Sequence, residues 1–121
     1  TQQKQQKERR GRMMVKVVYI AGPMRGLDDY GRRNFKEAED FVKRRTGWNV
    51  LNPAILPVDL PQERYMPICL AMLREADGII LLPGWEDSAG ATLERRFAEE
   101  TGKLILELED IGFRHGEAGR T

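Results

Sequence analysis

The chain has 121 residues and a net charge of +1, a size that suits one domain and a charge that gives no support for a nucleic-acid partner. Its single cysteine and single histidine exclude an intrachain disulfide and a cysteine-based metal cluster, and we expect neither a metal ion nor an organic cofactor. No apolar run approaches the roughly 20 residues of a membrane span, so we expect no membrane partner, and the lone cysteine suits a reducing cytoplasm.

The two ends of the chain differ in composition from its middle. Residues 1–12 contain no apolar side chain and five basic ones, which predicts a disordered basic tail. The domain is predicted to span residues 13–108. Residues 109–121 are predicted to form a polar C-terminal extension.

Short apolar runs alternate with segments of helical periodicity through the domain. The apolar runs predict strands, at residues 15–20, 48–51, 78–82 and 104–106. The periodic segments between them predict helices, at residues 30–45, 62–76 and 88–101. This βαβαβαβ order predicts an α/β fold, with a small Rossmann-like or flavodoxin-like parallel sheet and helices on both of its faces.

The predicted helix at residues 62–76 carries more apolar and sulfur-containing side chains than one buried face requires. One face is expected to be buried and to consist of Tyr65, Ile68, Cys69, Met72, Leu73 and Ala76. A surplus of apolar surface on a small domain is typical of an interface between subunits. We therefore expect a homo-oligomer, either a homodimer or a homotetramer.

Three loops follow predicted strands, and in a parallel sheet they open on the same edge, where ligands of open α/β sheets bind. The first loop contains Gly22-Pro23-Met24-Arg25-Gly26. Glycine lets backbone N–H groups approach an anion, and the Arg25 guanidinium matches a phosphate or a carboxylate. These residues predict an anion-binding loop, with an ordinary turn as the alternative.

The third loop leads into the helix that carries Glu94, about one helical turn after Gly90. We interpret Glu94 as a nucleophile whose ionised form is stabilised by the nearby helix N-terminus. The alternative is an exposed helix residue, because the following residues Arg95, Arg96 and Glu99 resemble a solvated face. The nucleophile interpretation requires Arg25, Ser88 and Glu94 to surround one pocket.

Other residues near these loops have two interpretations each. Asp87 is either a second carboxylate for general-acid catalysis or a cap of the following helix, for which Ser88 is also a candidate. Tyr19 either packs in the core or reaches the pocket from the carboxyl end of its strand. Trp85 and Tyr19 are both candidates for stacking on a planar ring.

Two segments, YIAGPMRGL from Tyr19 and ADGIILLPGWEDSAGATLE up to Glu94, resemble the nucleoside 2-deoxyribosyltransferase-like superfamily and, more closely, the family DUF4406. The resemblance covers residues 15–108. It implies cleavage of the N-glycosidic bond of a 2′-deoxyribonucleoside or its 5′-monophosphate through a covalent glutamyl–sugar intermediate. It also implies pockets that are completed by a neighbouring subunit.

The resemblance further implies roles for individual residues. Glu94, four residues after Gly90, matches the nucleophile, while the Gly22–Gly26 loop and Ser88 match residues that bind the phosphate. Pro23 stands where relatives have a serine in that loop. Cys69 stands where those relatives have an aspartate that assists the leaving base, which puts proton delivery in doubt.

The sequence therefore predicts an N-glycosidase or deoxyribosyltransferase with Glu94 and Asp87 as catalytic residues. Its partner is a small-molecule nucleoside or nucleotide bound by Tyr19, Gly22, Arg25, Gly26, Ser88 and Gly90. The alternative is a catalytically inactive nucleotide-binding module of the same fold. The base, the kind of ribose and the choice between transfer and hydrolysis stay open.

Overall fold

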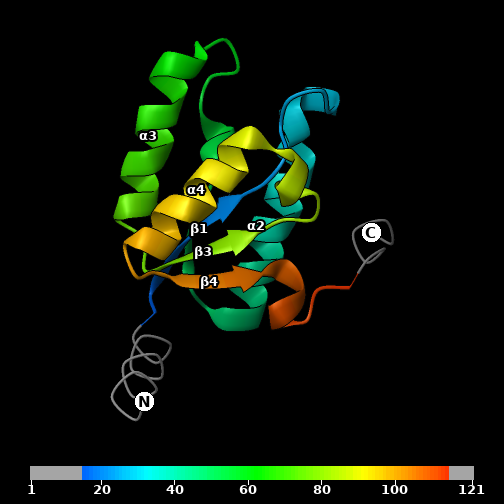
Figure 1. Ribbon diagram of the computed structural model, residues 1–121. Coiled ribbons are helices and arrows are strands. Elements are labelled where there is room, and N and C mark those ends of the chain that lie inside the picture. Colours follow the sequence, from blue (N-terminus) through cyan, green and yellow to red (C-terminus); the bar gives the residue numbers. More distant parts are fainter. Residues whose placement is uncertain (1–14, 115–121) are drawn as a thin grey trace.

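The computed structural model describes residues 15–114 (Figure 1). The tail predicted at residues 1–12 and most of the predicted C-terminal extension lie outside the described residues. None of the helices in the described part of the chain has both the length and the apolar character that crossing a bilayer requires.

A parallel sheet of four strands forms the centre of the domain. The strands are β1 (Val17–Ala21), β2 (Asn49–Leu51), β3 (Gly78–Leu81) and β4 (Leu104–Glu107), in the order β2-β1-β3-β4. All three neighbouring pairs are parallel, with Tyr19 opposite Leu51 and Ile79. The structure confirms the predicted parallel sheet, and every predicted strand is present within a few residues of its predicted bounds.

Three helices cover the sheet, one on one face and two on the other (Figure 1). The single helix is α2 (Arg32–Thr46), and the opposite face carries α3 (Gln62–Arg74) and α4 (Ala89–Glu100). Short 3-10 turns join these elements: η1 (Asp28–Gly31), η2 (Pro53–Ile55), η3 (Trp85–Asp87) and η4 (Leu108–Ile111). The predicted arrangement with helices on both faces is confirmed.

The alternation of side chains along β1 divides the core into two clusters. Val18 and Ile20 point toward α2, where they pack with Phe35 and other apolar residues. Tyr19 and Ala21 point to the opposite face, toward α3 and α4. The strand therefore directs a tyrosine to the same side as the helix that carries the predicted nucleophile.

The end of the described chain packs on the domain beyond residue 108. Phe113 meets Phe41 of α2 edge to face, with 5.3 Å between the ring centroids. The Arg45 side chain donates a hydrogen bond to the backbone oxygen of Ile111 at 3.1 Å. The packed region thus extends past the predicted boundary, because two apolar side chains in the extension complete the cluster under α2.

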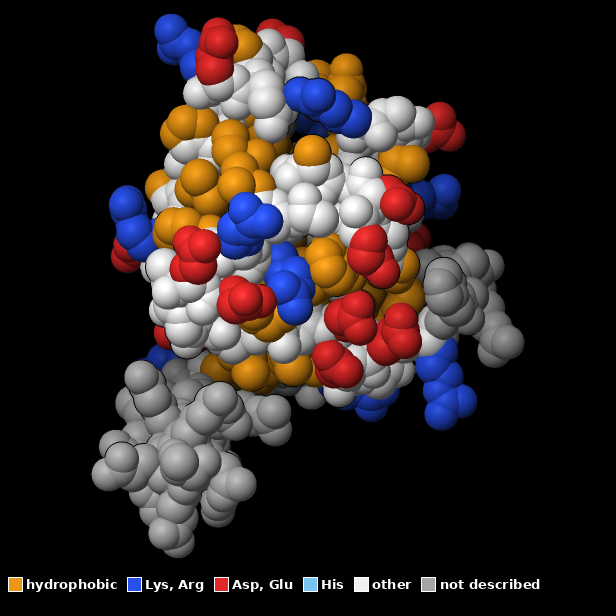
Figure 2. Space-filling model, in the orientation of Figure 1, with side chains coloured by type: hydrophobic (Ala, Val, Ile, Leu, Met, Phe, Trp, Pro, Cys, Tyr) orange, Lys and Arg blue, Asp and Glu red, His pale blue; other side chains and the backbone are white. Residues whose placement is uncertain are grey.

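The prediction for the buried face of α3 is wrong in part. Cys69 and Leu73 are fully buried, but Ile68 is 39% exposed. The reason is that the face of α3 in the core cluster on this side of the sheet is centred on Cys69 and Leu73, and Ile68 is not part of that cluster. Figure 2 shows hydrophobic side chains gathered over α3, and Leu93 on α4 is 47% exposed as well.

Candidate functional site

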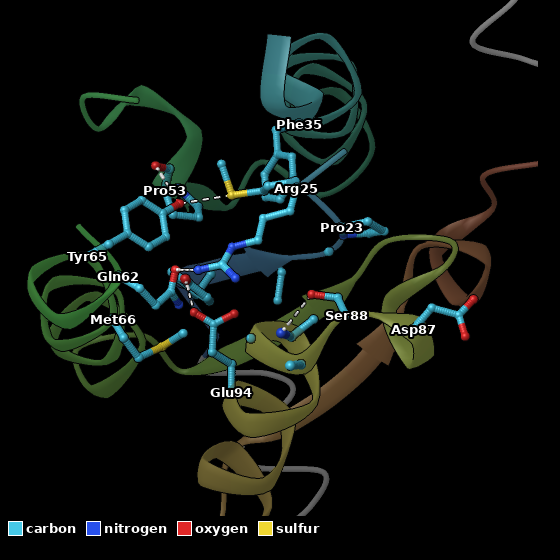
Figure 3. Close-up of a pocket in the computed structure, with 17 residues that line it drawn as sticks. Pro23, Arg25, Phe35, Pro53, Gln62, Tyr65, Met66, Asp87, Ser88 and Glu94 are labelled. Carbon is cyan, nitrogen blue, oxygen red and sulfur yellow. Dashed lines mark hydrogen bonds between the residues drawn. The ribbon is translucent and has the colours of Figure 1, made fainter. Parts of the chain in front are cut away.

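A cavity of about 470 Å³ lies at the carboxyl edge of the sheet, where the loops after β1, β2 and β3 meet (Figure 3). Its volume is within the range of pockets that hold small molecules. Seven of the predicted site residues line it: Tyr19, Gly22, Arg25, Asp87, Ser88, Gly90 and Glu94. The predicted grouping of Arg25, Ser88 and Glu94 around one pocket is therefore present, whereas Gly26 does not line the cavity.

Glu94 is a buried carboxylate in the wall of this cavity, with only 6% of its surface exposed. The Tyr19 hydroxyl donates a hydrogen bond to Oε2 of Glu94, and Tyr19 itself is fully buried (Figure 3). The interpretation of Glu94 as part of a solvated face is wrong. Glu94 shares the inner face of α4 with the buried Ala91 and Ala98, while Arg96 and Glu99 are exposed.

The electrostatics of Glu94 differ from the expectation for a helix N-terminus. Burial raises the pKa of the Glu94 carboxyl to about 7, and the hydrogen bond from Tyr19 only partly offsets this rise. Loss of hydration therefore disfavours the anion, which is the opposite direction from the stabilisation expected at a helix N-terminus. The carboxylate has a pKa near neutrality, which is suited to a group that must be ionised to react and that is later released.

Tyr19 is fixed as a hydrogen-bond donor. Burial, and then the negative charge of Glu94, raise the pKa of the Tyr19 phenol far above its ordinary value. The phenol consequently keeps its proton and holds one oxygen of Glu94 in place. Stacking of Tyr19 on a ligand ring is incompatible with its complete burial among the strands and helices.

The loop after β1 approaches the loop after β3 closely. A Cβ atom on Gly22 would lie 2.7 Å from the Cβ atom of Leu82, so only glycine fits there. Gly26 has a φ of +79°, a left-handed conformation that favours glycine. Gly26 therefore shapes the turn and does not form part of the cavity wall. Between these two glycines, Arg25 donates a hydrogen bond from Nη2 to Oε1 of Gln62 at 2.7 Å.

Ser88 begins α4 as its N-cap, as predicted. Its Oγ accepts a hydrogen bond from the backbone N–H of Ala91 at 3.2 Å. The hydroxyl hydrogen remains free to donate to an anion at this helix N-terminus. In Figure 3, Ser88 lies on the α4 side of the cavity and the Arg25 guanidinium on the α3 side, where its Nη2 is engaged by Gln62.

Asp87 is at the edge of the cavity, and the structure does not pair it with Glu94. It ends the turn η3, and its side chain points away from Glu94 (Figure 3). Ser88, not Asp87, caps α4. Trp85, unlike Asp87, does not line the cavity: its Nε1 donates to Glu107 at 3.0 Å, and the Arg95 guanidinium covers its ring.

Cys69 is buried beside the cavity and does not line it. Burial raises the pKa of its thiol to about 11, so the group stays a neutral thiol at physiological pH. No three side chains among His, Cys, Asp and Glu of residues 15–114 gather in a way that could hold a metal ion.

Sequence reasoning missed one wall of the cavity. The missed residues are Met24, Phe35, Pro53, Gln62, Tyr65 and Met66. Apart from Gln62 they are apolar or aromatic, and sequence alone assigns such residues to packing. For all of them except Phe35, which lies in α2, the available signal was their position at the start of α3 or in the loops after strands, because these segments reach the carboxyl edge.

Comparisons with known proteins agree with this architecture. A 2-desoxiribosyltransferase from Leishmania mexicana has a similar structure, with a TM-score of 0.61 and 24% sequence identity over 76% of this chain and 63% of that chain. This likeness supports the fold, and no curated protein matches the chain. The family model for a domain of unknown function, DUF4406, matches residues 16–107, which covers most of the sequence. The chain therefore belongs to the DUF4406 family.

Proposed function

We propose that this protein cleaves the N-glycosidic bond of a nucleoside or nucleotide through a covalent intermediate on Glu94. The observation that carries the proposal is the buried Glu94 carboxylate, which lines a cavity of nucleotide size and is held by Tyr19. The solved 2-desoxiribosyltransferase with the same fold supports the same class of reaction.

The proposed reaction is a double displacement. An ionised oxygen of Glu94 attacks C1′ of the sugar, and the bond between C1′ and the base nitrogen breaks with its electron pair on the base. The transition state has oxocarbenium character, which a nearby carboxylate stabilises. Water or a second base then attacks C1′ and releases Glu94 as the carboxylate.

Tyr19 is the proposed positioning group in this reaction. It occupies one oxygen of Glu94, which leaves the other oxygen to face C1′. Because its hydrogen bond lowers the pKa of Glu94, it also increases the ionised fraction at neutral pH.

Arg25, Ser88 and the backbone of Gly22 are the proposed contacts of a 5′-phosphate. Arg25 supplies a positive charge, and Ser88 supplies a hydroxyl at the N-terminus of α4. The hydrogen bond to Gln62 uses Nη2 of Arg25, which leaves the other N–H groups of the guanidinium for a phosphate.

A panel of nucleosides and nucleotides tests the proposal. The wild-type protein is incubated with ribo- and 2′-deoxyribonucleosides and their 5′-monophosphates, and free base is measured by chromatography, with and without a second base as acceptor. Glu94→Gln should release none, while Glu100→Gln on the exposed side of the same helix should behave as wild type. Equal base release by both variants would contradict the proposed role of Glu94.

A second candidate function is nucleotide binding without turnover. It is favoured by Cys69 on α3, because a fully buried thiol offers no carboxylic acid to assist the leaving base. Calorimetry that detects tight nucleotide binding, together with no base release across the panel, would support this candidate. Cys69→Asp does not separate the two functions cleanly, since an aspartate at a fully buried position is expected to destabilise the domain.

We also propose that the protein forms a homodimer or homotetramer through α3 and works in the cytoplasm. The exposed Ile68 and Leu93 on neighbouring helices support a contact with a second copy. Ile68→Asp should shift the molar mass seen by light scattering toward the monomer. A monomer already present in the wild type at micromolar concentration would contradict this proposal.

A further inference from the structure

Tyr65 contributes a hydroxyl group to a wall of the cavity in which Gln62 is the other polar side chain. The residue lies near the N-terminus of α3 and is partly buried. Its hydroxyl is 2.9 Å from Sδ of Met24 and 3.3 Å from the backbone oxygen of Pro53 (Figure 3). The neighbouring wall residues Phe35 and Met66 offer no hydrogen bonds.

Both acceptors hold this hydroxyl weakly. A thioether sulfur is a weak acceptor, and 3.3 Å is longer than an ordinary hydrogen bond between a hydroxyl and an oxygen. When a partly buried hydroxyl with weak partners donates to a better acceptor, the free energy of the system falls. Tyr65 is therefore ready to exchange these contacts for an acceptor atom on a ligand.

The phenol is a donor and not a base at any working pH. Burial raises its pKa above the ordinary value, and the nearby Cys69 and the charge of Glu94 raise it further. Tyr65 and Glu94 both line the cavity, and they lie on different sides of it (Figure 3). Tyr65 thus keeps a hydrogen available on the side of the cavity opposite the proposed nucleophile.

The proposed reaction needs such a donor. When the bond between C1′ and the base breaks, negative charge develops on the base. Among the other lining side chains that the structure describes, Tyr19 is engaged by Glu94 and the Asp87 side chain points away. Gln62 accepts from Arg25 through its oxygen, which leaves its amide N–H groups as the competing donor on this wall. Arg25 and Ser88 are assigned to the phosphate in the proposed function.

We propose that the Tyr65 hydroxyl donates a hydrogen bond to a ring nitrogen or carbonyl oxygen of the leaving base. This inference rests on the proposed function. As the bond from C1′ to Glu94 forms, the electron pair of the glycosidic bond passes to the base, where the Tyr65 hydrogen bond stabilises it. The phenol retains its proton, because its pKa is raised, and water supplies the proton that makes the free base neutral.

The test compares two leaving groups in Tyr65→Phe. The guanine of 2′-deoxyguanosine 5′-monophosphate develops negative charge as it leaves and needs a hydrogen-bond donor. The base of the 7-methyl nucleotide carries a positive charge before cleavage and leaves as a neutral molecule. The kcat for the ordinary substrate should fall on the order of 10–100-fold, as expected for loss of a hydrogen bond to a developing charge. The kcat for the 7-methyl substrate should change less than about threefold, because little charge then develops for the bond to stabilise.

Tyr30→Phe is the matched control, since it removes a phenol hydroxyl from an exposed residue outside the cavity wall. An equal loss on both substrates in Tyr65→Phe would indicate a structural role and overturn the inference, as would an unchanged rate on the ordinary substrate. Should thermal unfolding show that Tyr65→Phe does not fold, Tyr65→Met is measured in the same way, because its flexible side chain also lacks the hydroxyl.

The failure of this inference can be told apart from the failure of the proposed function. If the wild type releases no base from any member of the nucleoside and nucleotide panel, or if Glu94→Gln is fully active, the reaction itself is wrong. If the wild type is active, Glu94→Gln is inactive and the kcat of Tyr65→Phe falls by the same factor on both substrates, only the role of Tyr65 is wrong.

Discussion

Among residues 15–114, an amide and a carboxylate side chain are buried, Asn52 and Glu94, and their surroundings differ. Asn52 has both ends of its amide engaged: its nitrogen donates to Glu39 at 3.0 Å, and its oxygen accepts from the backbone N–H of Ala54 at 2.8 Å. Glu94 has one partner among the described residues, Tyr19, and lines a cavity. Asn52 is thus satisfied by the fold, whereas Glu94 retains hydrogen-bonding capacity that only a ligand or water could use.

The difference extends to the elements that surround the two groups. Asn52 is the N-cap of η2 and is held by Ala54 and by Glu39 of α2. Glu94 lies on α4 between the small buried residues Ala91 and Ala98. Burial without complete satisfaction distinguishes a candidate functional group from a structural one, and the following predictions test that distinction.

The largest effect is expected for Glu94→Gln on base release. The amide keeps the shape of the side chain and can still accept from Tyr19, but it cannot attack C1′. We expect kcat to fall at least about 10³-fold, while nucleotide affinity stays within about tenfold. Single-turnover assays and calorimetry measure the two quantities, and an equal loss of both would place Glu94 in binding alone.

The same variant should alter stability in a pH-dependent way. The native pKa of Glu94 is about 7, against an ordinary value of 4.5, so the native state binds the proton more tightly than the unfolded state does. The contribution of Glu94 to stability is therefore present below about pH 4.5 and is lost as the pH rises through 7, by up to about 3 kcal/mol. Glu94→Gln lacks this loss.

Urea unfolding at pH 5 and pH 8 measures this difference. The advantage of Glu94→Gln over wild type should be larger at pH 8, and the comparison within each pH cancels the other titrating groups. An advantage of the same size at both values would show that the native pKa of Glu94 is ordinary.

Asn52→Ala is expected to lower stability with little effect on kcat, in contrast to Glu94→Gln. It removes the partner of the Ala54 N–H and of Glu39, so we expect a loss of about 2 kcal/mol in the free energy of unfolding. Because Asn52 does not line the cavity, kcat per folded molecule should change little. A large fall in kcat at unchanged stability would remove the contrast between the two buried polar groups.

Tyr19→Phe should shift the pH profile of activity. The Tyr19 hydrogen bond lowers the pKa of Glu94, so its removal should move the rise of kcat/KM upward from about pH 7 by about one pH unit. Tyr30→Phe removes an exposed hydroxyl and should leave the profile in place. A profile that stays fixed in Tyr19→Phe would mean that another group controls the ionisation.

The smallest effects are expected at the exposed rim. Arg25→Ala should raise KM about tenfold for a 5′-monophosphate and little for the nucleoside, because only the former has a charge to bind. Gln62→Ala should have a weaker effect in either direction, since it frees Arg25 without removing its charge. If Arg25→Ala affects both substrates equally, Arg25 does not bind the phosphate.

Much of the fold could be predicted from local patterns in the sequence. Apolar runs bounded by Gly78 and Pro83 specify a buried strand, and Ser88 specifies the start of α4, because these signals depend on neighbours along the chain. The spacing of Ala91, Glu94 and Ala98 also fits one helix face, a signal that the charges of Arg95, Arg96 and Glu99 concealed.

Only the tertiary structure decided which side chains meet. Tyr19 and Glu94 are 75 residues apart in the sequence. Their contact depends on the face of the sheet to which Tyr19 points and on how α4 packs against that face. The direction of Asp87, the exposure of Ile68 and the cavity wall around Tyr65 depend in the same way on how separate elements pack. Periodicity fixes the side of an element that a residue occupies, but burial, and with it the raised pKa of Glu94, requires the neighbours that folding brings from elsewhere in the chain.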